Sequence, residues 1–518
     1  MSRETASAMW ASHRDTQGIR KAEDFAKFTI PSLMADPLKG HDQADTLEYD
    51  FQSYGALLVN NLTSKLVSAL FPAGRPCFQI TLDATLRDAA KQRGVDDTAL
   101  NAATAKLELS ATERLFRNAN LAKLTRAVKL LITTGDALLY RDTRRGKFLV
   151  WSKQSYTVRR DAFGDLSTVV LKQRIAFEHL PQEVQADATS KRIMAKPSDK
   201  LEYYTVIEWR PTPQGARRVV VWNELEGKRV GPESSYPEHL CPWVPVAWNV
   251  PDGEHYGRGY VEEYSGAFAK ISILSEQLGL YELEALNMLN LVDEAAGAVI
   301  DDYKTASTGD YVPGKVGGSV GSYERGDYNK IATIRASIEA DVMLLNRAFM
   351  YTGQMRDAER VTVEEVRTIA REAENLMGGT YSLLAEHMQA PLAYLMMYEE
   401  ALTDPDFMLG LVQKSYRPTI VTGIPALTRS AAVQALFKSA QEVAAVVPAL
   451  AQVSQRFDPE RIIELIFRSN SAPLEEISKS ADQIAAEAEA EAAQANASLD
   501  VASGALAANE SIPGVLNG

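Results

Sequence analysis

The sequence has few cysteines and no apolar run long enough to cross a membrane. Its two cysteines among 518 residues, Cys77 and Cys241, are far apart, which excludes a disulfide framework and a four-cysteine zinc site. No window approaches the roughly 18 consecutive apolar residues of a membrane span, and the N-terminal residues MSRETASAMWASHRD lack the apolar stretch of a secretory signal. We therefore expect a soluble protein, made inside the cell without a membrane partner, with both cysteines as buried thiols.

Histidine is also scarce, and its placement does not favour a metal site. The six histidines are scattered along the chain at His13, His41, His179, His239, His255 and His387. They show neither the HExxH spacing nor another paired spacing of metal ligands. The adjacent carboxylates Asp301 and Asp302 could bind a divalent ion, but an isolated acidic pair is usually solvated surface. We predict no metal ion and no cofactor.

Two enzyme motifs are incomplete in the Gly-rich region before residue 322. GDYVPGKV at 309–316 has the Gly-x4-Gly-Lys spacing of a phosphate-binding loop, but valine follows the lysine where Ser or Thr must reach magnesium. Gly317, Ser319 and Gly321 match a nucleophile elbow, with His387 downstream as a conceivable base, but the strand-turn-helix context is missing. We therefore expect a protein that is not an enzyme, and a nucleotide-binding enzyme is the less favoured alternative.

Composition and charge indicate a folded protein with an acidic surface. Hydrophobic residues make up 46% of the sequence, charged residues make up 24%, and no linker or fixed-period repeat divides the chain. We expect an α+β fold, predominantly α-helical, in one elongated subunit of several parts. The net charge of -13 argues against a protein that grips nucleic acid, because such binding depends on Lys and Arg. It does not exclude a conduit, since an acidic wall repels phosphates and lets DNA slide.

Helical patterns dominate the first 140 residues, and strand patterns follow them. The apolar run NNLTSKLVSALFP at 60–72 predicts a helix that stops at Pro72. From about Lys147 to Phe177 and from Leu201 to Glu224, β-branched and aromatic residues alternate around the turn sequences DAFGD and PTPQG. These segments predict two hairpins in a small sheet.

Two long amphipathic helices are predicted further along the chain. The first runs from Val261 to about Leu289, roughly 43 Å at about 1.5 Å per residue. The second begins near Thr333, after a Gly-rich insert of strand or loop from about Leu291 to Lys330. Their apolar stripes, spaced by three and four residues, are Val261, Tyr264, Phe268, Ile271, Leu274, Leu278, Tyr281 and Ala285 on the first helix and Ile334, Ile338, Val342, Leu345 and Phe349 on the second.

A loop and a kinked helix follow the second amphipathic helix. The polar residues TGQMRDAER predict a loop before Val361. The next helix starts with a capping box formed by Thr362 and Glu365. Gly378 and Gly379 predict a kink in this helix, and Pro391 predicts a second one.

Two groups of basic residues could contact nucleic acid. Arg141, Arg144, Arg145 and Lys147 lie at an expected turn, where we favour an exposed charged turn over a binding role. Arg356 and Arg360 lie in the loop between long helices, where a role facing DNA and an exposed charged loop are equally supported.

These segments closely resemble the portal, or head-to-tail connector, of short-tailed, podovirus-type bacteriophages that encode their own RNA polymerase. The similar blocks run in order across about four fifths of the chain, and their number and order argue against a chance resemblance. They are FTIPSL at 28–33, NNLTSKLVSALFP at 60–72, SYTVRRDAFGD at 155–165, IAFEHLP at 175–181, HLCPWVPV at 239–246, GEHYGRGYVEEY at 253–264, AERVTVEEVRTIARE at 358–372, GGTYSLL at 378–384 and PTIVTG at 418–423.

The resemblance implies the portal fold and a division of the chain into parts. The implied parts are a wing over 1–260 with a β-rich portion at about 147–250, a first stem helix at 261–290, a clip at 291–330, a second stem helix at 331–350, a channel loop at 351–361, a kinked tunnel helix at 362–400, a return to the wing at 401–427, and a crown with an Ala-rich C-terminal helix or tail at 428–518. In the channel loop, Gln354, Arg356 and Arg360 are the implied DNA contacts. Gly378 and Gly379 are the implied kink of the tunnel helix.

The resemblance also implies the partners and the function. It implies a homo-oligomeric ring, a dodecamer, at the portal vertex of the capsid, assembled in the host cytoplasm and carrying double-stranded DNA in its channel. The implied protein partners are the terminase large subunit, the tail adaptor, the major capsid and scaffolding proteins, and internal core proteins. The main alternative is another ring-forming virion adaptor or scaffold protein without a DNA channel.

Overall fold

The structure is a computed structural model in which the chain divides into two compact units, Met1–Pro425 and Ala426–Gly518. It describes residues 4–420 except 37–46, 73–75, 84–96, 214, 286–287, 294, 296–298, 308–309, 312–317, 319, 325–327, 352–378, 380–382 and 403–404. All described residues lie in the first unit. The predicted Ala-rich crown and tail at 428–518 lie outside them.

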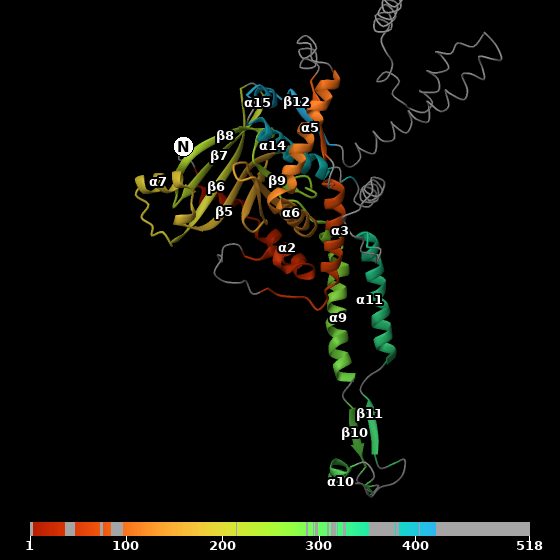
Figure 1. Cartoon of the computed structure of the whole chain (residues 1–518). Coiled ribbons are helices and arrows are strands. Elements are labelled where there is room, and N and C mark those ends of the chain that lie inside the picture. The colour runs from red at the N-terminus through yellow and green to blue at the C-terminus, as the bar shows by residue number, and fades with distance from the viewer. Residues whose placement is uncertain are drawn as a thin grey trace, which may run out of the picture. The chain divides into compact units, whose positions relative to one another are not determined.

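A five-stranded antiparallel sheet forms the largest β structure among the described residues (Figure 1). Its strands follow one another in sequence order: β4 (Tyr156–Arg160), β5 (Leu166–Ala176), β6 (Lys200–Pro211), β7 (Arg217–Leu225) and β8 (Lys228–Pro237). Successive side chains of a strand point to opposite faces of the sheet. Val169 and Ile207 therefore lie in one apolar cluster, on one face. Val170 and Val206 lie in a second cluster, on the other face, and helix α1 (Ala6–His13) packs on this second cluster. Both predicted hairpins are confirmed, with their turns at 161–165 and 211–215.

The prediction that the first strand segment belongs wholly to this sheet is wrong. Strand β3 (Lys147–Trp151) pairs with β2 (Asp136–Asp142) in a separate antiparallel sheet of order β3-β2-β9, with β9 at Trp243–Ala247. The chain leaves one sheet for the other through Ser152, Lys153 and Gln154, which are buried. Alternation alone could not locate this change because both strands carry the same pattern.

Helices pack together with the three-stranded sheet in one large apolar core. Leu58, Leu62 and Leu66 of α3 (Tyr54–Leu70) share this core with Leu131 of α6 (Asn120–Thr134) and Met396 of α14 (Ala390–Ala401). As predicted, the run 60–72 is helical and ends just before the proline. The remaining elements of this part are α2 (Thr16–Phe28), η1 (Pro31–Met34), α3 (Tyr54–Leu70), β1 (Phe78–Leu82), α5 (Asp97–Phe116), η3 (Arg117–Ala119), α6 (Asn120–Thr134), η4 (Phe177–His179), α7 (Gln182–Ser190), η5 (Glu238–Leu240), α14 (Ala390–Ala401), α15 (Pro405–Val412) and β12 (Tyr416–Ile420), which pairs with β1.

Helices α9 (Ser265–Ala285) and α11 (Tyr328–Ala348) lie side by side and antiparallel, joined by ion pairs from Lys270 to Asp341 at 2.7 Å and from Arg335 to Glu282 at 2.7 Å (Figure 1). The short helix α8 (Tyr260–Glu263) precedes α9. The predicted stripes face inward: Leu278 is half-buried, and Leu345 and Phe349 are fully buried.

The ends of both long helices differ from the sequence prediction. The first helix stops at Ala285 instead of about Leu289, because β10 (Met288–Val292) pairs with β11 (Val320–Glu324) in an antiparallel hairpin. The second helix starts at Tyr328, earlier than predicted. The insert also contains a short helix, α10 (Ile300–Thr305), which adds to the predicted strands and loops.

Both cysteines are free and buried, as predicted. Burial raises the pKa of Cys77 to about 11 and that of Cys241 to about 12, so both thiols stay protonated and unreactive near neutral pH. Among the described residues, no helix is long and apolar enough to span a membrane.

A close backbone approach fixes the segment that leads into α8. Helix α6 ends at Gly135 with φ +84°, and the N–H of Gly257 donates to Oδ1 of Asp136 at 2.9 Å. A Cβ atom on Gly135 would lie 2.5 Å from the carbonyl oxygen of Gly257. This junction therefore requires glycine both for its backbone conformation and for space.

Replacing Gly135 with alanine is expected to destabilise the fold by at least about 2 kcal/mol, because backbone strain and a steric clash add together. Gly227 has a similar φ of +74°, but a Cβ atom there would have no other atom within 4 Å. Gly227→Ala is therefore the matched control and should cost only about 1 kcal/mol. Urea unfolding of both variants measures the difference. Equal losses would show that space at Gly135 is unimportant.

Candidate functional site

The predicted DNA-contacting loop and the kinked helix start between two described elements, α11 and the π-helical turn η8 (Ala385–Gln389). Gln354, Arg356, Arg360 and Gly378 lie outside the described residues, so their roles stay predictions. Gly379 is described and has φ +92°, a conformation that favours glycine. The site that can be built from contacts is therefore the pair of attachment points on either side of residues 352–382.

The first attachment point is the C-terminus of α11. Met350 has φ +54°, and its N–H donates to the carbonyl of Arg347 at 3.3 Å. The N–H of Tyr351 donates to the carbonyl of Asn346 at 2.8 Å. These two bonds form a Schellman cap with methionine at the left-handed position usually occupied by glycine. Because Met350 is buried, packing holds it in this strained conformation.

Side chains of α3 bind the carbonyl groups that this cap leaves free. Nδ2 of Asn61 donates to the carbonyls of Phe349 at 3.0 Å and Met350 at 3.3 Å, and Nζ of Lys65 donates to that of Met350. The ring of Tyr54 also packs edge to face on Tyr351, with centroids 6.3 Å apart. A positive charge at a helix C-terminus is favourable in the helix dipole. Helix α3 thus clamps the start of the predicted channel loop.

The second attachment point is the π-helical turn η8 (Ala385–Gln389), which joins directly onto α14. Pro391 lies in the first turn of α14, and a proline lacks the N–H that a regular helix would use there. The side chain of Gln389 is buried, and its Nε2 donates to the carbonyl of Leu70, the last residue of α3. One helix, α3, therefore holds both ends of residues 352–382.

An aromatic cluster connects the same region to the start of α9. The rings of Tyr260, Tyr264, Phe268 and Phe349 pack against one another with centroids 5.2–5.8 Å apart. The hydroxyl of Tyr260 donates to the carbonyl of Ala348 at 3.0 Å, and burial raises its pKa. The cluster ties both long helices to the attachment point of the loop.

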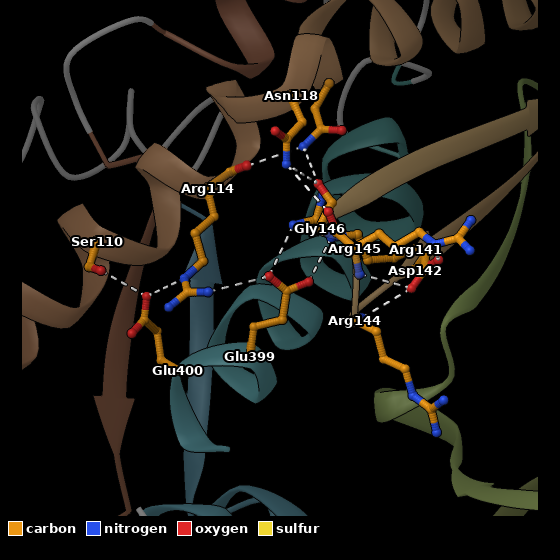
Figure 2. Close-up of polar contacts among 11 residues, drawn as sticks. Ser110, Arg114, Asn118, Arg141, Asp142, Arg144, Arg145, Gly146, Glu399 and Glu400 are labelled. Carbon is orange, nitrogen blue, oxygen red and sulfur yellow. Dashed lines mark hydrogen bonds and ion pairs between the residues drawn. The ribbon is translucent and has the colours of Figure 1, made fainter. Parts of the chain in front are cut away.

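A buried ionic cluster anchors the far end of α14 (Figure 2). Nε of Arg141 lies 2.7 Å from Oε1 of Glu399, and the two side chains are 1% and 3% exposed. Nε of Arg114 on α5 lies 2.6 Å from Oε1 of Glu400, which also accepts from Ser110. Glu400 holds the pKa of Arg114 above its usual value. The cluster joins α5, the β2–β3 hairpin and α14.

The sequence prediction of an exposed charged turn is wrong for Arg141. Its guanidinium lies inward, over the ring of Phe148 and against Glu399. The other three residues of that group, Arg144, Arg145 and Lys147, are exposed as predicted. The alternation of side chains along β2 explains the difference. Arg141 lies opposite Phe148 within the strand pair and is buried, whereas the other three residues lie at or beside the turn.

The incomplete enzyme motifs gain no support from the described residues. Gly321 lies within β11 of an antiparallel hairpin, whereas a nucleophile elbow needs a turn between a parallel strand and a helix. Asp301 and Asp302 lie in the first turn of α10, and Asp301 is highly exposed. In the described part of the chain, no group of three His, Cys, Asp or Glu side chains could hold a metal ion.

Comparison with known proteins decides what this scaffold is. A family model described as bacteriophage head to tail connecting protein matches residues 3–477. The chain belongs to this connector family. The portal protein of Pseudomonas phage phiKMV is 48% identical over 491 residues, covering 95% of each chain. That of Escherichia phage T7 is 30% identical over 465 residues, covering 86% of this chain and 82% of its own.

The resemblance to portal proteins of short-tailed phages that encode their own RNA polymerase is thereby confirmed, and the function is that of a head-to-tail connector. The connector relatives named above are structural proteins, and none is an enzyme. A chain from the neck of an empty gene transfer agent particle is also similar, with 13% identity, a TM-score of 0.36, and coverage of 82% of this chain and 90% of that one. At that score the structural likeness carries no further argument.

Sequence reasoning missed the residues that hold the start of the predicted channel loop. Asn61 and Lys65 lie on the polar side of a run identified only as an apolar helix, and their spacing of four residues is the one available signal. Their partners lie 285–289 residues further along the chain. Such distant pairs cannot be inferred from local pattern.

Replacing Lys65 with methionine is expected to destabilise the connector by about 1.5–3 kcal/mol, because a charged hydrogen bond to a helix C-terminus is lost. The rate of backbone amide hydrogen exchange should increase more at residues 345–351 than in β5. Lys129→Met on α6, a half-buried lysine without such a contact, is the control. Unchanged exchange at 345–351 would contradict the clamp.

Proposed function

We propose that the chain assembles into a closed ring of identical copies, twelve by the family resemblance, around a channel for double-stranded DNA at the portal vertex of the capsid. The observation that carries the proposal is a set of exposed apolar side chains on the two long helices. Ile273, Leu280 and Leu283 of α9 are 59%, 56% and 65% exposed, and Met343 of α11 is 69% exposed. Several large exposed apolar side chains on one pair of helices favour a protein interface.

These side chains point away from the contact between α9 and α11, because the predicted stripes already fill it. A neighbouring copy brings the same helix pair and can cover them. In a ring, every copy repeats this contact with the next, and closure prevents open-ended polymerisation. The choice of a ring over a dimer rests on the family resemblance, because exposed residues on both helices would suit either assembly.

The proposed channel carries DNA without gripping it. A ring of twelve chains would carry on the order of -150 charges, which repels the phosphate backbone. Contact would be limited to the loop 351–361, where Gln354, Arg356 and Arg360 are the proposed contacts. The clamp of α3 on both ends of 352–382 supports a loop held at a fixed place in each copy.

The clip is the proposed docking platform for protein partners: the terminase large subunit during packaging and the tail adaptor afterwards. Its support is a second set of exposed apolar residues: Leu291 lies in β10, and Val299, Ile300 and Tyr311 lie between β10 and β11 in sequence. The major capsid and scaffolding proteins and internal core proteins are proposed partners of other surfaces. The chain is proposed to reach the virion by assembly in the host cytoplasm.

Mass measurement of the purified assembly and single-particle images test the proposal together. A ring with a central channel of duplex width is the expected result. A stable, well-folded monomer would refute it. A ring without such a channel would instead support an adaptor or scaffold role.

Replacing Arg356 and Arg360 together with alanine is expected to lower the packaging rate or genome retention, because two positive charges that can contact passing phosphates are lost. Ring assembly should be unaffected. Packaging assays with the double variant measure this, and Arg144→Ala with Arg145→Ala is the control of equal charge change on an exposed turn. Unchanged packaging and retention would refute the DNA-contact assignment.

A further inference from the structure

A polar cleft of about 380 Å³ lies among α1, the start of α2 and the segment 253–258, far in sequence from the channel loop. It is lined by His13, Arg14, Lys21, Arg159 and His255, among others. The cleft is not part of the attachment points or the interface described above. Its size is that of a small-ligand site.

The side chain of His255 has a hydrogen-bonding conflict in this cleft. The backbone N–H of Arg160 donates to Nδ1 at 3.1 Å, so the neutral ring carries its proton on Nε2. That nitrogen lies 2.9 Å from Nη1 of Arg159, which can only donate. Two donors thus face each other without an acceptor between them. An acceptor placed beside both would satisfy them.

Several basic side chains in the cleft form no direct ion pair with a carboxylate among the described residues. Nδ1 of His13 is buried without a hydrogen-bond partner. Among the described residues, Arg14, Lys21 and Arg159 form no ion pair with a carboxylate, and Arg14 instead stacks on Trp10 with 4.2 Å to the ring centroid. These donors therefore make no direct contact with an anionic group among the described residues.

The carboxylates that line the cleft are already engaged elsewhere. Asp15 caps α2 by accepting from the N–H of Gly18 at 2.9 Å. Glu254 and Glu262 both pair with Arg258, at 2.5 Å and 3.5 Å. Lys153 is neutralised by Asp136 at 3.0 Å, so it adds no free charge. Five basic and three acidic side chains line the cleft, and Asp136 outside the lining pairs with the basic Lys153, which leaves a balance of about one positive charge.

We propose that this cleft binds a phosphate group, held by Arg159, His255 and His13 with Arg14 and Lys21 at its rim. A phosphate offers acceptor oxygens in several directions and up to two negative charges, which suits donors that converge from α1, β4 and the segment 253–258. A carboxylate has only two coplanar oxygens and one charge. The concave shape also fits a small anion better than the flat surface of a protein partner.

Binding of the anion is linked to proton uptake. Burial and the charge of Arg159 lower the pKa of both His13 and His255 in the free protein, while Glu4 acts on His13 in the opposite direction. Arg160 further lowers the pKa of His255. A bound anion raises both pKa values, so affinity for an anion of constant charge increases as the pH falls.

Calorimetric titration of the full-length assembly at constant ionic strength tests the site. The probes are inorganic phosphate, sulfate, glutarate and a short DNA duplex. One saturable site per chain is expected for phosphate, with sulfate, whose charge does not change, binding roughly fivefold more tightly at pH 6 than at pH 8. If the duplex competes with inorganic phosphate for the site, the natural ligand is a phosphate group of DNA. If the duplex does not compete, the natural ligand is a free anion. Glutarate binding as tightly as phosphate would overturn the ligand class.

Variants separate the site from general charge attraction. Arg159→Gln is expected to weaken phosphate binding about tenfold or more, and Lys21→Gln less, because Arg159 donates directly. Arg20→Gln, on the same helix but outside the cleft, is the matched control. Equal weakening by Arg20→Gln, or no saturable binding, would overturn the proposal.

A stability measurement distinguishes a ligand site from a structural role. Since Arg159 faces another donor, Arg159→Gln should unfold in chloride buffer no earlier than the unchanged protein, and phosphate should no longer raise its unfolding temperature. Marked destabilisation of Arg159→Gln without any anion would show that Arg159 is structural and would overturn the assignment.

Discussion

Replacing Glu399 with alanine is expected to destabilise the folded chain by about 3–5 kcal/mol, because it leaves the buried Arg141 guanidinium without its anion. Among the described residues, only the carbonyl of Gly146, at 3.0 Å, would still accept from that guanidinium. Arg141→Ala should cost less, since Nη1 of Arg114 remains 3.8 Å from Glu399. Urea unfolding of the two variants measures both losses and their order.

Two further variants make this prediction specific to the buried pair. Arg145→Ala removes a guanidinium from the adjacent turn, where the side chain is 81% exposed, and should change stability by less than about 0.5 kcal/mol. The double variant Arg141→Met with Glu399→Leu should be more stable than Glu399→Ala, because it leaves no unpaired charge. A loss below about 1 kcal/mol for Glu399→Ala would contradict the role of the pair.

The parts of the fold that follow from the sequence are those with a local periodic signal. The stripes of α9 and α11 were predictable because residues three and four apart share one helix face, whatever covers that face. The hairpin turns at 161–165 and 211–215 were predictable because their glycines and prolines mark turns. In both cases the deciding residues lie within a few positions of one another.

The parts that did not follow depend on contacts between distant residues. Arg141 looked like a turn residue because its partner Glu399 lies 258 positions away. The first long helix was extended too far because Met288–Val292 has no strong strand pattern and is held extended by pairing with Val320–Glu324. The cleft around His255 left no sequence signal either, since its donors come from three separate segments.

Replacing Leu280 and Leu283 together with glutamate is expected to abolish ring assembly while leaving the monomer folded. Both side chains are more than half exposed in the single chain, so the substitutions remove little internal packing. Burial of a leucine at an interface contributes about 1.5–3 kcal/mol, and a buried unpaired carboxylate costs several kcal/mol more. The dissociation constant of each contact should therefore rise by a factor of about a thousand or more. Native mass measurement would report monomers in place of rings.

Met194→Glu is the control, because Met194 is 92% exposed but lies near α7, away from α9 and α11. It adds a negative charge without affecting the proposed contact, and rings should persist. The double variant would be especially damaging because a closed ring contains the same interface between every pair of neighbours, so one substituted sequence weakens all contacts at once. Intact rings of the Leu280 and Leu283 variant would show that neighbouring copies meet elsewhere, and the exposed apolar face of α9 would then need a different partner.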